Sequence, residues 1–516
     1  ILYIMSASSQ TEYPVLPATD SISVNEQTQY QPQNQPIQPQ MSHSVRYNPV
    51  NGGVFTKSND YIEFTIRPQA GVYLDGSKTT LNLKFKAIPK NKTTPVAMSI
   101  YSTRCGIQGA FSQLVVTNSG NTLEFVTNYN RTYALASKMY TSPDQMRSAP
   151  SVRDITADGD DNTTQQQAPV TGVRMSTAVD DNTDVTCNEY ECSIPISLSS
   201  LFGPSSRKCL PLSKLTEPIN VKLYLTNNCN EVYYSKSGAD TAVSYDNATS
   251  DYQISNVSLE CHQVTFTDSV MSVIDAASEG NDNYQEWDAD QVSSSLNNII
   301  PSLQQDQILL SNTQYSNVKS IMNQTWYASP ASGNEGCTMT YASLQSGLYK
   351  YNVSCDGQYI LNRDVGNNNL KQLHNSDALI VANILSITRN ATDLWDANCQ
   401  LNTGAHESGR WTPYDPDTAG FLETGPVDVP SALVNQFAGV DLQPTIPDDF
   451  YTGISTLTSK DMSRKLTGSN FKGKQIVVHV RRHNAIPSSS GGQVYHSVLH
   501  VGCKIILEKG SLRREC

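Results

Sequence analysis

Residues 111–130 read FSQLVVTNSGNTLEFVTNYN, and this stretch decides the fold class. Apolar residues cluster at 114–116 and again at 123–126. Between them, residues 118–121 (NSGN) are of the types that tolerate a positive φ, which is typical of a tight hairpin turn. The stretch therefore predicts two neighbouring antiparallel strands, with a short helix expected at 133–139.

Strands of the same kind lie on both sides of this hairpin. Residues 61–66 (YIEFTI) and 81–86 (LNLKFK) alternate apolar with polar side chains, so each strand has one buried and one solvated face. Such strands are typical of antiparallel sandwiches. Further strands are expected at 194–198, 221–225, 257–261, 476–480 and 499–507. Two more helices are expected, one after Thr267 or Asp268 and one at 376–387.

Composition points to the same class. Of the 516 residues, 38% are hydrophobic and 16% are charged, against about 45–50% and about 25% in typical domains. This excludes a coiled coil or a helical bundle. We predict an all-β chain in two consecutive blocks, 48–268 and 269–516, each large enough for an eight-stranded sandwich.

Two segments do not fit either block. Residues 1–47 include the Gln- and Pro-rich run 27–40 (QTQYQPQNQPIQPQ), which predicts a flexible N-terminal arm. Residues 145–190 are polar and acidic, which predicts a long surface insertion in the first block.

The chain carries no recognisable export or membrane signal. No apolar run approaches the ~20 residues that a bilayer needs, and the start of the sequence does not resemble a signal peptide. Met5 is a candidate initiator. The eleven cysteines are scattered without a CxxC, so we expect reduced thiols, and the Asn-x-Ser/Thr sequons are interpreted as unglycosylated.

Charge is distributed unevenly along the chain. The net charge is −12, yet residues 460–516 hold eleven Lys or Arg against three Asp or Glu. The conservative interpretation is a solvated strand edge and tail, and the sharper one is a basic face toward packaged nucleic acid. The candidate residues for that face are Lys472, Lys474, Arg481, Arg482, Arg513 and Arg514.

Catalytic, cofactor and metal motifs are not recognised. Residues 468–475 (GSNFKGKQ) resemble a P-loop, but Gln475 replaces the Ser or Thr that binds Mg²⁺, and a strand rather than a helix is expected next. The acidic run 154–161 lacks the ligand order of a calcium loop. We therefore expect no catalytic, cofactor or metal site and interpret 468–475 as a loop.

Several stretches, in this order, resemble the double jelly-roll major capsid proteins of double-stranded DNA viruses. The resemblance is nearest to the polinton-like, adintovirus and virophage branch and more distant to adenovirus hexon. Residues 280–345 depart from the family pattern. The matching stretches are 111–130, 193–225, 252–266, 270–276, 451–456 and 498–510.

The resemblance implies two eight-stranded jelly rolls with a few short helices in loops, no enzymatic activity and a place in the virion shell. It implies a homotrimer that forms a pseudo-hexameric capsomer of an icosahedral capsid around a DNA genome. Neighbouring capsomers, penton and minor capsid proteins are the implied partners, with packaged DNA against the basic C-terminal segment. The arm would tie capsomers together, and the 145–190 insertion would face outward.

Two alternatives remain open at this point. A secreted β-sandwich carbohydrate-binding protein or glycoside hydrolase also tolerates strands rich in Ser, Thr and Asn. It would need exposed aromatic residues, and the chain has four Trp, at 287, 326, 395 and 411. A minor capsid or spike protein is the third interpretation.

Overall fold

The structure is a computed structural model. It describes residues 41–88, 98–102, 106–140, 172–174, 189–196, 200–202, 209–236, 250–268, 270–272, 285–298, 305–310, 314–327, 348–360, 364–366, 452–455, 468–482 and 493–516. Within these ranges no helix is long and apolar enough to cross a membrane.

The first half of the chain forms a jelly roll, called roll 1. Its first sheet has the order β1-β13-β4-β10, with β9 also on β4 and β2 also on β13; its second has the order β3-β11-β6-β7. If the main strands are lettered B to I in chain order, the two sheets read B-I-D-G and C-H-E-F, which is the jelly-roll order. The strands are β1 (Met41–Tyr47), β2 (Val54–Thr56), β3 (Tyr61–Ile66), β4 (Tyr73–Ile88), β6 (Phe111–Asn118), β7 (Asn121–Thr127), β9 (Tyr190–Pro195), β10 (Leu210–Pro211), β11 (Ile219–Leu225) and β13 (Asp251–Thr265).

The second half repeats this order as roll 2. One sheet runs β14-β22-β16-β20, extended by β23 on β22, and the other runs β15-β21-β17-β18, with β19 also on β17. The lettering again gives B-I-D-G and C-H-E-F. The strands are β14 (Gln285–Asn298), β15 (Gln305–Leu309), β16 (Val318–Tyr327), β17 (Leu348–Cys355), β18 (Gln358–Tyr359), β19 (Val365–Gly366), β20 (Thr452–Ser455), β21 (Ile476–Arg482), β22 (Gln493–Glu508) and β23 (Ser511–Glu515).

Alternation along the strands builds the two cores. In β3 and β11 every second residue is buried, so Ile62, Phe64, Val221 and Leu223 line the interior of roll 1. In roll 2 the strand β21 does the same with Ile476, Val478 and Val480. This confirms the predicted two-sheet sandwich with one dry face on each sheet.

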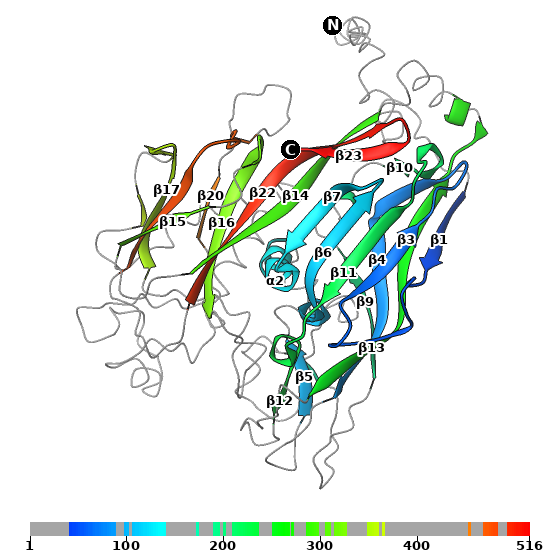
Figure 1. The fold of residues 1–516 in the computed structure, drawn as a ribbon, viewed down its shortest axis with the longest axis horizontal. Coiled ribbons are helices and arrows are strands. Elements are labelled where there is room, and N and C mark those ends of the chain that lie inside the picture. Colours follow the sequence, from blue (N-terminus) through cyan, green and yellow to red (C-terminus); the bar gives the residue numbers. More distant parts are fainter. Residues whose placement is uncertain are drawn as a thin grey trace, which may run out of the picture.

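Strand β22 departs from the expected alternation. Nearly all of its sixteen residues are buried, on both faces. Figure 1 shows the reason: β22 and β14 form the side of roll 2 that faces roll 1. The rest of roll 2 covers one face of these strands, and β7 and helix α2 (Tyr129–Tyr140) of roll 1 lie on the other. A strand covered on both faces loses the period-2 pattern, because neither face meets water.

Local predictions around residues 111–140 are confirmed. Ser119 and Gly120 connect β6 to β7 with φ values of 49° and 78°, as expected for a two-residue hairpin turn. The helix α2 follows, beginning four residues before the predicted start. The expected helix at 376–387 lies outside the described residues.

The predicted N-terminal arm, 1–47, was assigned seven residues that form a strand. Residues 41–47 form β1, which pairs antiparallel with β13 from Met41–Thr265 to Tyr47–Leu259. They are therefore the first strand of roll 1, because their backbone completes the edge of β13. Residues 1–40 lie outside the described part of the chain.

The structure also places strands in residues 280–345 and 145–190. Residues 280–345, which did not match the family pattern, contain β14, β15 and β16. Within 145–190, the range predicted to be a surface insertion, β8 (Gly172–Arg174) joins a small sheet with β5 (Met98–Ser102) and β12 (Tyr233–Lys236). Most of that insertion lies outside the described residues.

Candidate functional site at the junction of the two rolls

The hairpin that ends the described chain binds roll 1 through its turn. Lys509 and Gly510 join β22 to β23 with φ values of 51° and 78°. The backbone N–H and the hydroxyl of Thr216, in roll 1, donate to the Gly510 carbonyl over 2.9 and 3.1 Å. A Cβ on Gly510 would lie 2.5 Å from the Thr216 methyl group, so both conformation and space favour glycine there.

Two asparagines at the β6–β7 turn clamp Leu512 of β23. The backbone N–H of Leu512 donates to Asn118 Oδ1 over 2.7 Å, and the Leu512 carbonyl accepts from Asn121 Nδ2 over 2.9 Å. Asn118 is fully buried and also donates to the carbonyl of Glu217 over 2.9 Å. The Leu512 side chain is buried in the core of roll 1 together with Ile505 and Leu507. The C-terminal hairpin of roll 2 thus completes the core of roll 1.

A disulfide and an arginine hold the last residues of this hairpin. Cys503 in β22 bonds to Cys516, so the prediction of reduced thiols is wrong for this pair. The antiparallel register places 504 opposite 515 and so brings 503 next to 516. Arg514 Nη1 donates to Gln291 Oε1 of β14 over 2.7 Å and reaches the Leu123 carbonyl of β7 over 3.4 Å. One side chain therefore contacts both rolls.

A second contact joins β14 to the end of β7. The Ser294 hydroxyl donates to the Thr127 carbonyl over 2.8 Å, and the two hydroxyl groups lie 2.9 Å apart. On the opposite face of β14, Ser293 accepts from the Tyr315 hydroxyl inside roll 2 over 3.0 Å. Successive residues of β14 therefore face different rolls.

An aromatic stack lies where α2 meets roll 2. The His496 and Trp326 rings, from β22 and β16, are stacked with centroids 4.3 Å apart. The guanidinium carbon of Arg131, from α2, lies 4.3 Å from the Trp326 ring centroid. Burial and the Arg131 charge lower the pKa of His496 to about 3. The imidazole is therefore neutral at physiological pH.

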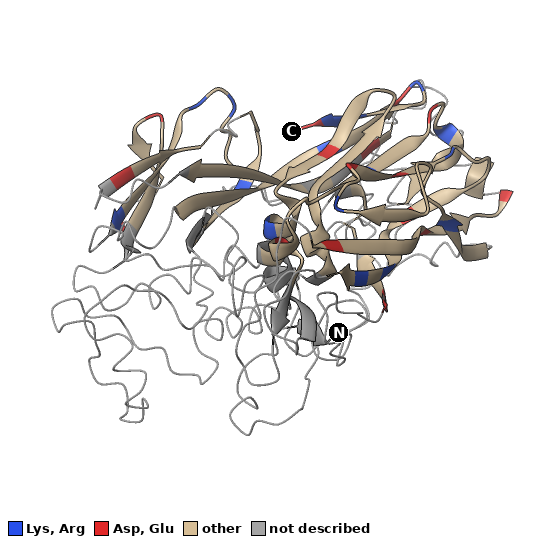
Figure 2. Ribbon diagram, turned by 60° about the horizontal axis from the view of Figure 1, so that its bottom comes forward, with Lys and Arg blue, Asp and Glu red and all other residues tan. Residues whose placement is uncertain are grey.

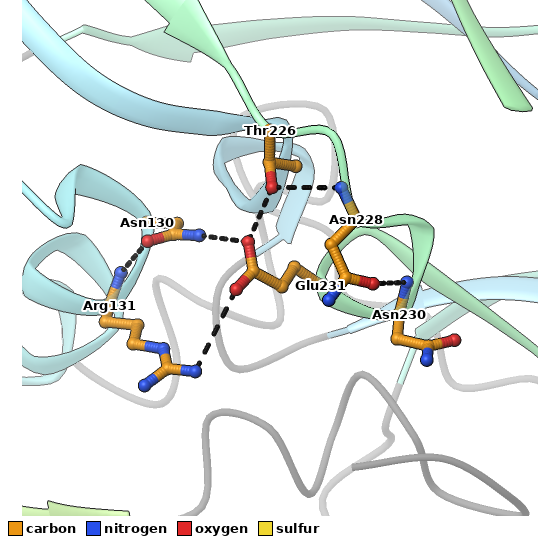
Figure 3. Close-up of polar contacts among 6 residues, drawn as sticks. All are labelled: Asn130, Arg131, Thr226, Asn228, Asn230 and Glu231. Carbon is orange, nitrogen blue, oxygen red and sulfur yellow. Dashed lines mark hydrogen bonds and ion pairs between the residues drawn. The ribbon is translucent and has the colours of Figure 1, made fainter. Parts of the chain in front are cut away.

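Arg131 is held in turn by a buried polar network within roll 1 (Figure 3). Its guanidinium lies 3.9 Å from Glu231 Oε1. The other carboxylate oxygen of Glu231 accepts from the Thr226 hydroxyl over 2.6 Å and from Asn130 Nδ2 over 3.2 Å. Glu231 belongs to a single turn, η5 (Cys229–Glu231), which Asn228 caps through the Asn230 N–H over 3.0 Å. The network fixes the Arg131 side chain against roll 2.

The six basic residues predicted for one face occupy three different places. Lys472 and Lys474 lie in the turn before β21, whereas Arg481 and Arg482 lie at its far end, which is about 20 Å away along a strand. Arg513 and Arg514 lie on β23. Figure 2 shows basic and acidic residues interspersed over the described part of both rolls.

Acidic neighbours accompany several of these residues. Arg481 lies 3.8 Å from Asp364, and Arg513 lies 2.8 Å from Glu515 and 3.4 Å from Glu508. Arg514 is engaged at the junction, whereas Lys472 is exposed and takes part in none of the described ion pairs.

Residues 468–475 form a loop, as predicted. Lys474 N–H donates to the Phe471 carbonyl over 3.0 Å around Gly473, and β21 follows directly. Among the described residues no group of three or more His, Cys, Asp or Glu side chains is placed to hold a metal ion. Trp326, one of the four aromatic candidates for a sugar-binding surface, is 1% exposed and packs in the junction. Trp395 and Trp411 lie outside the described residues.

Sequence reasoning missed the junction. Thr216, Asn118 and Glu231 are common polar residues whose partners lie far away along the chain. The one local signal was Gly510, which follows the apolar residues 505–507 and marks a turn.

Neither a protein-family model nor a curated protein sequence matches the chain. Solved structures do match it in shape. A chain of the PBCV-1 virus capsid has a TM-score of 0.51 at 9% identity, covering 92% of this chain and 96% of that chain. A chain of the Sputnik virophage has a TM-score of 0.52 at 12% identity, covering 94% of this chain and 92% of that chain. Together with the repeated B-I-D-G and C-H-E-F sheets, these matches identify the fold of the chain as the double jelly roll.

Proposed function

We propose that the chain is the major capsid protein of an icosahedral double-stranded DNA virus. Three copies form a pseudo-hexameric capsomer, and capsomers build the shell of the virion around the genome. The role is structural, and no catalytic step belongs to it.

The observation that carries this proposal is the full-length structural correspondence to the PBCV-1 capsid chain, which covers 92% of this chain and 96% of that one. A match over that share of the chain includes parts of both rolls. A single jelly roll occurs in proteins of many functions, whereas two joined rolls in one chain are a far more specific arrangement.

The junction supports the proposal on physical grounds. The hairpin β22–β23 supplies apolar side chains to the core of roll 1 and backbone groups to Asn118, Asn121 and Thr216. Such an interface joins the two rolls into one unit. Three two-roll units around a threefold axis present six similar rolls, which is the geometry of a pseudo-hexagonal tile.

Further partners are inferred from this role. Neighbouring capsomers, penton proteins and minor capsid proteins bind the edges of the tile, and residues 1–40 act as an arm between tiles. Packaged DNA faces the basic C-terminal segment, where Lys472 and Lys474 are the best placed of the six basic residues. The 145–190 insertion faces outward.

Negative-stain electron microscopy of the purified full-length chain tests the proposal. We expect hexagonal towers or closed shells. Particles without threefold or hexagonal symmetry, at every protein concentration tested, would contradict it.

A further inference from the structure

His496 occupies an unusual position for a titratable residue. Its side chain is fully buried in the middle of the junction, stacked on Trp326. Its Nδ1 atom lies 3.0 Å from Gln324 Nε2, an amide that donates. The ring proton therefore resides on Nε2, and this buried atom has no hydrogen-bond partner within the part of the chain that the structure describes.

The surroundings favour the neutral ring and oppose a second positive charge. On the roll 1 side, α2 presents Arg131 to the same indole ring, and η5 presents Glu231 to Arg131. On the roll 2 side, β16 contributes Gln324 and Trp326, and β14 places Leu296 opposite His496. None of these three side chains titrates. On β22 itself, His500 lies four residues along the strand. The Glu231 carboxylate lies 3.9 Å from the arginine rather than beside the imidazole.

We propose that His496 makes the junction between the two rolls acid-labile. The rolls stay docked while the imidazole is neutral, and they separate at the α2 contact when it takes up a proton. The cause is a cation that would have to be buried next to Arg131, with no acceptor at Nε2 and no counter-charge of its own among the described residues.

The linkage between proton uptake by His496 and opening of the junction sets the direction and the pH range of the effect. In the docked state burial, and then the Arg131 charge, lower the pKa of His496 to about 3. Once released to water the ring has the ordinary value of about 6.5. Below pH 6.5 the released state therefore binds one proton more than the docked state, and opening becomes easier until about pH 3. From these two values the opening constant rises about 30-fold between pH 7.5 and pH 5.

Hydrogen exchange of the full-length protein, followed by mass spectrometry, measures this opening. The probe is the α2 peptide 129–140, and the reference is the core peptide 219–225. After correction for the intrinsic pH dependence of exchange, we expect the α2 peptide to exchange about 30-fold faster at pH 5 than at pH 7.5. The reference peptide should change little. Equal changes in the two peptides, or no change in either, would overturn the proposal.

Two substitutions separate His496 from other acid-sensitive groups. His496→Gln keeps a polar side chain, and His496→Phe keeps an aromatic ring against Trp326. Either should remove the acid dependence of the α2 peptide, whereas His43→Gln on the exposed edge strand β1 should leave it intact. Acid opening that persists in both His496 variants would refute the role of this residue. If neither variant folds, the comparison of the two peptides in the unmodified protein decides. Because the opening takes place within a single chain, its test does not depend on assembly into a capsomer.

Discussion

The side-chain oxygen of Asn118 accepts the backbone N–H of Leu512 over 2.7 Å, across 394 positions of sequence. Asn118 is the last residue of β6 in roll 1, and Leu512 belongs to β23, the strand that extends a sheet of roll 2. This one bond therefore links the two halves of the chain, and it is buried. Contacts of this kind couple the stability of each roll to that of the other.

Replacement of Asn118 by alanine is expected to destabilise the protein by about 1–3 kcal/mol, because the Leu512 N–H and the Glu217 carbonyl lose a buried partner. Urea titration at a fixed protein concentration measures the change. Asn220→Ala is the matched control, since Asn220 lies on the same sheet but accepts one part-buried bond, from Thr65. An Asn118 variant no less stable than the Asn220 variant would show that the clamp contributes little.

Replacement of Glu231 by glutamine is expected to cost about 3 kcal/mol, because it removes the carboxylate charge beside the buried Arg131 guanidinium. The side chains of Arg131 and Glu231 are 8% and 17% exposed. The double variant Arg131→Met with Glu231→Gln should recover part of that loss, which a double-mutant cycle from urea titrations detects. Strictly additive effects would mean that the two groups do not interact.

Two truncations differ by seven residues and should behave differently. A chain that lacks 1–40 should fold and trimerise as the full-length chain does, because it retains β1. It should fail to form closed shells, because it lacks the proposed arm. A chain that lacks 1–47 also loses β1 and exposes the edge of β13, so it should unfold at lower temperature and aggregate. Thermal melts and electron microscopy of both proteins test this. Closed shells from the chain that lacks 1–40 would refute the role of the arm in assembly. Equal melting temperatures of the two truncated chains would refute the role of β1 in stability.

Charge reversal at Lys472 and Lys474 should weaken binding of double-stranded DNA to the purified, unassembled protein and reduce the salt dependence of that binding. The pair Lys84→Glu and Lys86→Glu, on β4 of roll 1, is the control and should change binding less. Filter binding at several salt concentrations gives the slope. Indistinguishable slopes for the two variants would remove these lysines from the proposed DNA face.

Local chemistry made parts of this fold predictable. The turn at 118–121 could be assigned because Gly120 readily accepts the positive φ that a hairpin needs, although the other positive φ falls on Ser119. The β3, β11 and β21 patterns arise because one face meets water. Strand β14 was missed because its Ser, Asn and Asp residues pack between two rolls and show no apolar alternation. Strand β1 was missed because its exposed Ser42, His43 and Ser44 look like a continuation of the arm.

The junction could not have been predicted in the same way. The partners of Asn118, Thr216 and Arg131 are set by how one roll packs on the other, which no local pattern encodes. The Cys503–Cys516 pair depends on the register of β22 with β23. For the basic residues the sequence suggested one common face that the structure does not form. They are close in sequence, but they lie at the two ends of β21 and on β23, and some of them pair with acidic residues.

The measurement that tests the central claim most directly is the mass of the full-length protein in solution, by light scattering coupled to size exclusion. A capsid building block should elute as a stable species of about 170 kDa, three times the chain mass of 56.6 kDa. A species of 56.6 kDa that persists at every concentration tested would contradict the account.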